Sequence, residues 1–106
     1  MNTRWAVVLA ALTFMGTSAA TAAEPDGAAL FKSCAACHGA DGAGQTSVGK
    51  SLKVRDLRSD EVQKQTDMQL MKTISGGKGK MPAYGKKMTT AEITAVIAHV
   101  RMLKKK

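Results

Sequence analysis

Two cysteines and a histidine stand close together in the first half of the chain, in the order Cys34-Ala35-Ala36-Cys37-His38. The thiols are three residues apart and His38 follows Cys34 by four positions, so on a helical turn the three side chains share one face. Thiols placed in this way can reach the two vinyl groups on one edge of a porphyrin, while the imidazole lies beneath the iron. The C-x-x-C-H order therefore predicts covalent attachment of one c-type haem.

Other chemistries that use cysteine pairs fit this sequence less well. A thioredoxin-like redox site needs a βαβ context, and the chain has no alternating β-branched runs to supply strands. A zinc site needs four ligands, whereas the chain contains two Cys and two His. A disulfide between residues three apart would close too small a loop to stabilise a fold. A small dithiol oxidoreductase that uses Cys34 and Cys37 is kept as an alternative to be tested.

The first 23 residues have the pattern of a secretory signal peptide. Arg4 provides the positive charge, residues 5–15 are apolar, and small residues lead to Ala23, after which we predict cleavage. The apolar stretch is too short to span a bilayer comfortably, although retention as a membrane tether is the alternative. We therefore expect one mature domain, residues 24–106, in the periplasm.

The mature segment is basic and poor in aromatic residues. Residues 1–23 contain one cation and no acid, so the remaining 83 residues carry a formal charge of +7. Phe31 and Tyr84 are the only aromatic residues among them. A domain of this size is marginal in the apolar area that it buries. The composition therefore indicates, independently of the motif, that a large apolar cofactor completes the core.

Hydrophobic spacing and capping signals predict an all-α domain. A helix is expected from about residue 27 to 37, with Asp26 as its N-cap. Residues 39–59 begin with a glycine-rich loop and show no sustained period, and residues 59–65 form a short helix or a turn.

Two capping boxes predict the later helices. The first box, Thr66 with Gln69, begins a helix that ends at Gly76-Gly77. The second, Thr89 with Glu92, begins the clearest helix, whose apolar stripe runs to Leu103.

Met81 stands apart from the other methionines of the mature segment. It lies in a loop rich in glycine and lysine, and Pro82 keeps it out of helical geometry. The thioether therefore stands on an extended segment that can point inward. The other methionines of the mature segment are Met68, Met71, Met88 and Met102. All but Met88 fall in predicted helices, where methionine more often fills the core.

These features together closely resemble a class I cytochrome c, in particular its small bacterial monohaem members. The resemblance covers about residues 26–103 and is most specific at the C-x-x-C-H motif and at Gly79-Lys80-Met81-Pro82. It implies an all-α cytochrome c fold of three to four short helices wrapped around one covalently bound haem c. It further implies that Cys34 and Cys37 hold the thioether bonds, and that His38 is the proximal and Met81 the distal iron ligand. Met88, which lies beside a helix start, is the only serious competitor of Met81 for that role.

Two positions differ from the pattern of that family. The family often has a proline after the haem motif whose carbonyl accepts the Nδ1–H of the proximal histidine, but the mature segment has only Pro25 and Pro82. His38 is therefore expected to use another backbone carbonyl, near residues 47–49. His99 stands where the family usually has an aromatic residue at a helix crossing, and we expect it to pack there rather than to bind iron.

The resemblance implies an electron carrier and not an enzyme. Met–His ligation fills both axial positions of the iron and raises the reduction potential. The site could then pass single electrons but not readily bind oxygen or peroxide. The alternative is a haem enzyme or a gas-binding sensor with an open or weak distal position.

Charge suggests the kind of partner. Lys78, Lys80, Lys86 and Lys87 flank Met81, and no acid occurs in residues 72–87. Such a field would steer the protein to acidic docking surfaces on an oxidase, reductase, dehydrogenase or reaction centre. Lys53 or Arg55 could pair with a haem propionate. Nucleic acid is not expected as a partner, because the signal peptide directs export, and we expect a monomer.

Overall fold

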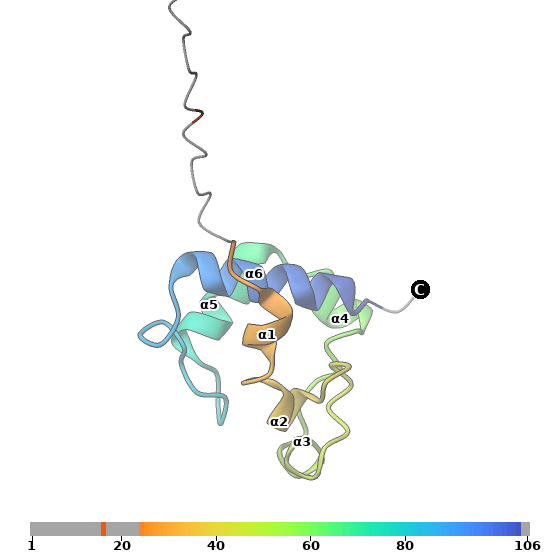
Figure 1. Ribbon diagram of the computed structural model, residues 1–106. Helices are drawn as coiled ribbons and strands as arrows, with labels where there is room; N and C mark the ends of the chain where they lie inside the picture. The colour runs from red at the N-terminus through yellow and green to blue at the C-terminus, as the bar shows by residue number, and fades with distance from the viewer. Residues whose placement is uncertain (1–15, 17–23, 105–106) are drawn as a thin grey trace, which may run out of the picture.

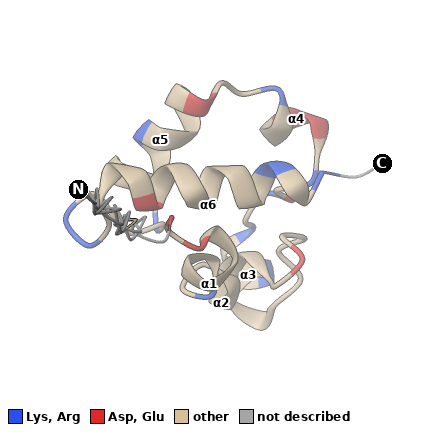
Figure 2. Cartoon of the chain, turned by 45° about the horizontal axis from the view of Figure 1, so that its top comes forward, with Lys and Arg blue, Asp and Glu red and all other residues tan. Residues whose placement is uncertain are grey.

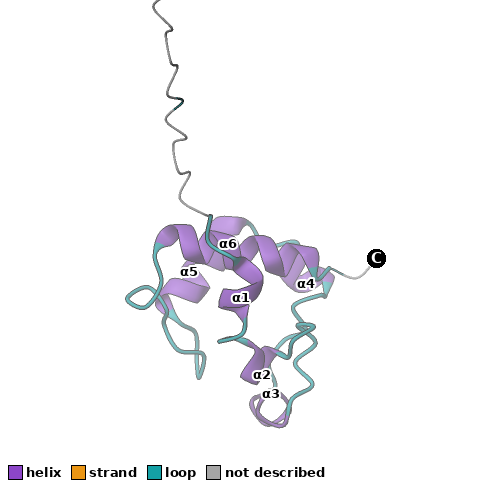
Figure 3. Cartoon of the chain, viewed as in Figure 1, coloured by secondary structure: helices purple, strands orange, loops and turns teal. Residues whose placement is uncertain are grey.

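The computed structural model describes residues 16 and 24–104, and within them the chain is helical, as predicted (Figures 1 and 3). The described part contains no strand, only one isolated bridge between Lys78 and Met81. Its helices are α1 (Gly27–Phe31), α2 (Ala35–His38), α3 (Ser47–Leu52), α4 (Asp60–Gln63), α5 (Asp67–Gly76) and α6 (Thr90–Met102). Four of these are only four to six residues long.

The predicted helix over residues 27–37 is interrupted. Asp26 caps α1 as expected, since its side chain accepts hydrogen bonds from the backbone N–H groups of Ala28 and Ala29. Residues 32–34 then form turns in which each backbone N–H bonds to the carbonyl three residues earlier, as in Cys34 N to Phe31 O at 2.8 Å. The prediction of one continuous helix is wrong because the chain tightens there before α2 begins.

The segment without sustained periodicity contains a short helix that the sequence did not predict. Thr46 caps α3, and its hydroxyl accepts a hydrogen bond from Gly49 N at 2.9 Å. This helix has no apolar stripe, and Val48 is 48% exposed. Helix α4, capped by Ser59, falls where a short helix or a turn was expected.

Both predicted capping boxes are formed. At α5 the Thr66 hydroxyl accepts from Gln69 N, and the Gln69 side chain accepts from Thr66 N. Thr89 and Glu92 form the same reciprocal pair at α6. The two longest helices therefore begin where the sequence predicted.

Helix α1 packs against α6 at the helix crossing where His99 was expected to lie (Figure 1). A Cβ on Gly27 would collide with the carbonyl of Ala95, so glycine is what permits the close approach. The rings of Phe31 and His99 lie 4.9 Å apart between centroids. The crossing joins the first and last helices of the domain, and His99 packs there as predicted.

The buried core consists of two clusters that α6 connects. Val62 and Leu70 pack with Ile93 and Ile97 in one cluster, and Phe31 packs with Val96 and Val100 in the other. Because adjacent residues of α6 belong to different clusters, this helix forms the common wall of the core.

Two of the methionines assigned to core filling are not buried. Met68 is 69% exposed and Met102 is 82% exposed, so that prediction is wrong for both. Met71 and Met88 do pack against the buried clusters.

The signal peptide predicted for residues 1–23 lies outside the described residues, apart from Gly16. Among the helices that the structure describes, none has the length and hydropathy needed to cross a bilayer.

Candidate haem site

One cavity collects the four residues that the sequence singled out. It has a volume of about 520 Å³, and its lining includes Cys34, Cys37, His38 and Met81. These residues come from two segments of chain, the turn and helix α2 on one side and the loop after α5 on the other. Thiols, imidazole and thioether therefore face a common space.

The walls of this cavity are the core itself. Both buried clusters contribute to it, through Phe31, Val62, Leu70, Val96, Ile97 and Val100. The volume falls in the range of ligand pockets, about 300–1,000 Å³. A large flat apolar group would complete the core here, as the scarcity of aromatic residues indicated.

The two cysteines are free thiols and form no disulfide. Both are half-buried. Burial, and secondarily the neighbouring Cys37, raises the pKa of the Cys34 thiol. A raised pKa disfavours the thiolate that a dithiol oxidoreductase would need for attack.

His38 is the last residue of α2 and is kept neutral by its surroundings. Burial lowers the pKa of its imidazole, and neutral imidazole is the form that binds metals. Its Nδ1 is buried and has no hydrogen-bond partner among the described residues. Since Nδ1 is enclosed, Nε2 is the nitrogen left to reach a ligand.

The expected carbonyl partner for His38 near residues 47–49 is therefore not found. At the end of α3, Gly49 O accepts from Val54 N at 3.0 Å, and Lys50 O accepts from Lys53 N at 3.2 Å.

Met81 reaches the cavity from a narrow turn. Lys78 and Met81 exchange two backbone hydrogen bonds, of 3.1 and 2.9 Å, which place Gly79 and Lys80 at its tip. The competing Met88 packs against both buried clusters, whereas Met81 is the methionine in the lining of the cavity. The geometry favours Met81 as the distal candidate.

Tyr84 is a residue of the cavity that sequence reasoning did not assign to the site. Its backbone N donates to Ile74 O at 2.9 Å, which ties the loop to the end of α5. Burial raises the pKa of its phenol, with smaller contributions from the charges of Cys34 and Cys37. Lys87 Nζ lies 5.6 Å from the ring centroid. The sequence did offer a signal for Tyr84, because this aromatic residue follows Met81 by only three positions in the same loop.

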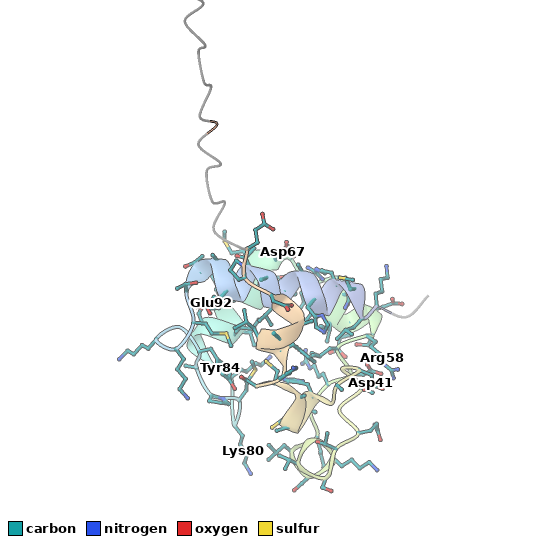
Figure 4. All side chains as sticks on the ribbon, in the orientation of Figure 1. Asp41, Arg58, Asp67, Lys80, Tyr84 and Glu92 are labelled. Atoms are coloured by element: carbon teal, nitrogen blue, oxygen red, sulfur yellow. The ribbon has the colours of Figure 1, made fainter. Side chains whose placement is uncertain are left out.

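Basic side chains from two elements also line the cavity. Lys53 and Arg55 approach it after α3, and Lys78 and Lys80 approach it from the Met81 loop. Arg55 also pairs with Glu61 at 3.4 Å. Figure 4 shows Lys80 and Tyr84 on the same loop, with Lys80 at its far end. These cations could meet the carboxylates of a cofactor.

The residues present fit a covalently bound haem. The apolar walls suit a porphyrin, the two thiols suit its vinyl edge, and a neutral imidazole and a thioether are both available as axial ligands. The basic groups in the lining suit propionates.

Comparisons with known proteins agree with this fit. Residues 22–100 match the family described as cytochrome c oxidase, cbb3-type, subunit III. Cytochrome c-553 of Nitratidesulfovibrio vulgaris is 53% identical over 55 residues, which is 52% of this chain and only half of that relative. Cytochrome c6 of Synechococcus is 34% identical over 89 residues, covering 83% of this chain and 77% of that relative.

A solved structure has a similar arrangement. The KustC0563 c-type cytochrome superposes with a TM-score of 0.70 at 34% identity. The superposition covers 76% of this chain and 99% of that one.

Proposed function

Since the chain belongs to the cytochrome c family, whose members bind haem c covalently, we propose that it is a periplasmic monohaem carrier of single electrons with His/Met ligation. The observation that carries this proposal is the convergence of Cys34, Cys37, His38 and Met81 on one core cavity. When bound, the haem supplies the Fe(II)/Fe(III) couple.

Each of these residues has a distinct role in the proposal. Cys34 and Cys37 hold the group through thioether bonds, and His38 is the proximal ligand. Met81 occupies the distal position and raises the reduction potential. If His38 and Met81 both bound the iron, small molecules would be kept from it, and the group would supply electron exchange only.

Two alternatives make different demands on the same residues. A haem enzyme or gas sensor would need an open or weak distal position. Met81 instead lines the cavity, and its loop is held by hydrogen bonds between Lys78 and Met81 and by hydrogen bonds to the end of α5. A dithiol oxidoreductase would need a reactive thiolate, whereas burial raises the pKa of Cys34. Both observations favour the carrier.

The carboxylates of the cofactor are proposed to meet Lys53 or Arg55. Both line the cavity, and Arg can bind a carboxylate through two parallel hydrogen bonds. To bind a propionate, Arg55 would interact with Glu61 and the propionate together, or would give up its ion pair with Glu61. That ion pair is exposed and contributes little to stability.

The partner is proposed to be a redox protein with an acidic docking surface. Lys78 and Lys80 line the cavity and are exposed, and Lys86 and Lys87 follow on the same loop. Figure 2 shows lysines on the loop beyond the N-terminal end of α6, at the other end of that helix from the C-terminus. The positive field of these four lysines would speed the approach of an acidic partner.

The export proposal has its support in the first 23 residues, and we propose cleavage after Ala23 and a monomeric mature domain.

Covalent attachment is the first point to test. The full chain should be expressed with the machinery for cytochrome c maturation, and the purified protein extracted with acidic solvent before a pyridine haemochrome spectrum is recorded. We expect one haem per chain to remain with the protein. Rapid binding of carbon monoxide by the ferrous protein at neutral pH would contradict the closed carrier site.

The positive field has its own test. Oxidation of the ferrous protein by anionic hexacyanoferrate(III) should slow with added salt, because salt screens the attraction. Lys80→Glu should slow it more than Lys104→Glu, an equal change of net charge beyond the far end of α6. Equal effects of the two variants would show that only net charge matters.

A further inference from the structure

Helix α2, which carries the haem motif, depends on other segments for its orientation. It spans only Ala35–His38, and a helix of one turn is not stable alone. Its carbonyl groups nevertheless all have partners. Ala35 O accepts from Gly39 N at 2.8 Å, and His38 O accepts from Gly44 N at 2.7 Å.

The two carbonyls between these are bound by a side chain. Thr46 Oγ1 lies 2.7 Å from Ala36 O and 3.2 Å from Cys37 O, so its one hydrogen is shared and the shorter bond goes to Ala36. Among the described residues, Thr46 is the only one whose side chain bonds to α2. Ten residues of sequence separate it from Ala36.

The same hydroxyl also begins the next helix. Thr46 is the N-cap of α3, and its oxygen accepts from Gly49 N at 2.9 Å. Gly49 in turn fits closely, because a Cβ there would collide with the carbonyls of Cys37 and Gly44. One oxygen atom thus joins the end of α2 to the start of α3.

We propose that Thr46 is a positioning residue for the proximal ligand: its hydroxyl fixes α2 against α3 and so sets how His38 meets the iron. The inference rests on the proposed haem ligation by His38. It is sharpened by the buried His38 Nδ1, which has no acceptor among the described residues. With that nitrogen unbound, the position of the ring depends on the backbone that carries it.

The chain contains a matched control for this role. Thr66 is also an N-cap threonine, whose hydroxyl accepts from Gln69 N at 3.1 Å. No hydrogen bond from Thr66 to α2 is found in the described part of the chain. Loss of the Thr66 hydroxyl therefore removes a helix cap alone, whereas loss of the Thr46 hydroxyl removes a cap and the connection to α2.

The test compares Thr46→Val, Thr46→Ser and Thr66→Val as full-length holoproteins. Unfolding by denaturant measures the capping role, while the midpoint potential and the electron paramagnetic resonance g-values of the oxidised protein report on the ligands. Both valine variants should lose stability. Only Thr46→Val should shift the potential and the g-values, and Thr46→Ser should restore both to those of the wild type.

A second variant serves if Thr46→Val yields no holoprotein. Glycine is nearly as good an N-cap as threonine, so Thr46→Gly removes the hydroxyl at little capping cost and should give the same shifts. Unchanged potential and g-values in the Thr46 variants, beside a loss of stability equal to that of Thr66→Val, would reduce Thr46 to a helix cap. A wild-type protein without acid-stable haem would instead overturn the proposed function itself.

Discussion

The two sides of the candidate haem site are built differently. The proximal segment, residues 35–54, is closed on itself by hydrogen bonds between residues several positions apart, including Thr46 Oγ1 to Ala36 O and Gly44 N to His38 O. The distal loop, residues 77–85, is anchored at its base, where Tyr84 N and Gly85 N donate to the carbonyls that end α5. Its tip is exposed.

This difference predicts different local stabilities. A segment that is closed by hydrogen bonds at several points opens at a higher free energy than an exposed loop that is anchored only at its base. The proximal ligand should therefore remain in place under conditions in which the distal ligand exchanges. A carrier with this arrangement keeps its cofactor fixed while one ligand stays adjustable.

The largest effect should follow from loss of the proposed haem, which both sides of the site would contact. We expect the double variant Cys34→Ala with Cys37→Ala to be largely unfolded, because the cavity between the two buried clusters has no other filling. Circular dichroism during heating would measure this. A cooperative transition in the double variant would show that the helices fold without the cofactor.

A smaller loss of stability should distinguish the proximal segment from the distal loop when one glycine in each is replaced. In Gly49→Ala, the new Cβ would lie 2.6 Å from Gly44 O and closer still to Cys37 O, at a cost of about 1–3 kcal/mol. In Gly79→Asn, the new side chain meets open space. Its positive φ is one that asparagine tolerates, so the cost should be below about 1 kcal/mol. Denaturant unfolding of both holoproteins would measure these costs, and equal losses would contradict the proposed difference.

Much of this site, but not its support, could be predicted from sequence. The C-x-x-C-H motif, Met81 before Pro82 and the capping boxes are local patterns, and local patterns are visible in one sequence. Helix α3 is too short for a repeating apolar stripe, since Val48 and Leu52 are its only apolar side chains beyond glycine, and Val48 is 48% exposed. The bonds from Thr46 to α2 join residues ten apart through one hydroxyl, for which no sequence period exists.

The errors have physical causes of the same kind. The break after Phe31 comes from a local tightening of the turn that helical spacing cannot reveal. Exposure of Met68 and Met102 depends on which faces of α5 and α6 are covered by neighbours. His38 Nδ1 has no acceptor among the described residues, and one sequence does not reveal which carbonyl comes to lie beside a given side chain.

Ligand exchange provides a finer test of the distal loop. Imidazole added to the oxidised protein should displace Met81 and not His38. Pro82→Ala frees the preceding backbone, so the loop should open more easily and imidazole should bind about two- to five-fold more tightly. Spectrophotometric titration would measure the affinity. Unchanged affinity in Pro82→Ala would show that the proline does not hold the loop.

The smallest effect concerns alkaline pH. Burial raises the pKa of Tyr84, so above its unfolded pKa of about 10 the unfolded chain loses this proton first. Stability is then lost as pH rises through the folded pKa. In the holoprotein the cysteines are thioethers without charge, and burial remains the cause. Tyr84→Phe should lessen the loss of stability in this range, as followed by denaturant unfolding at several pH values; an identical decline would contradict it.

The central claim is that His38 and Met81 close the iron site, and it is tested most directly by the methionine–iron charge-transfer band of the oxidised protein. Met88→Leu is the matched control, because Met88 packs in the core and does not line the cavity. We predict the band in the wild type and in Met88→Leu, and its loss in Met81→Ala. A band that persists in Met81→Ala would contradict the account.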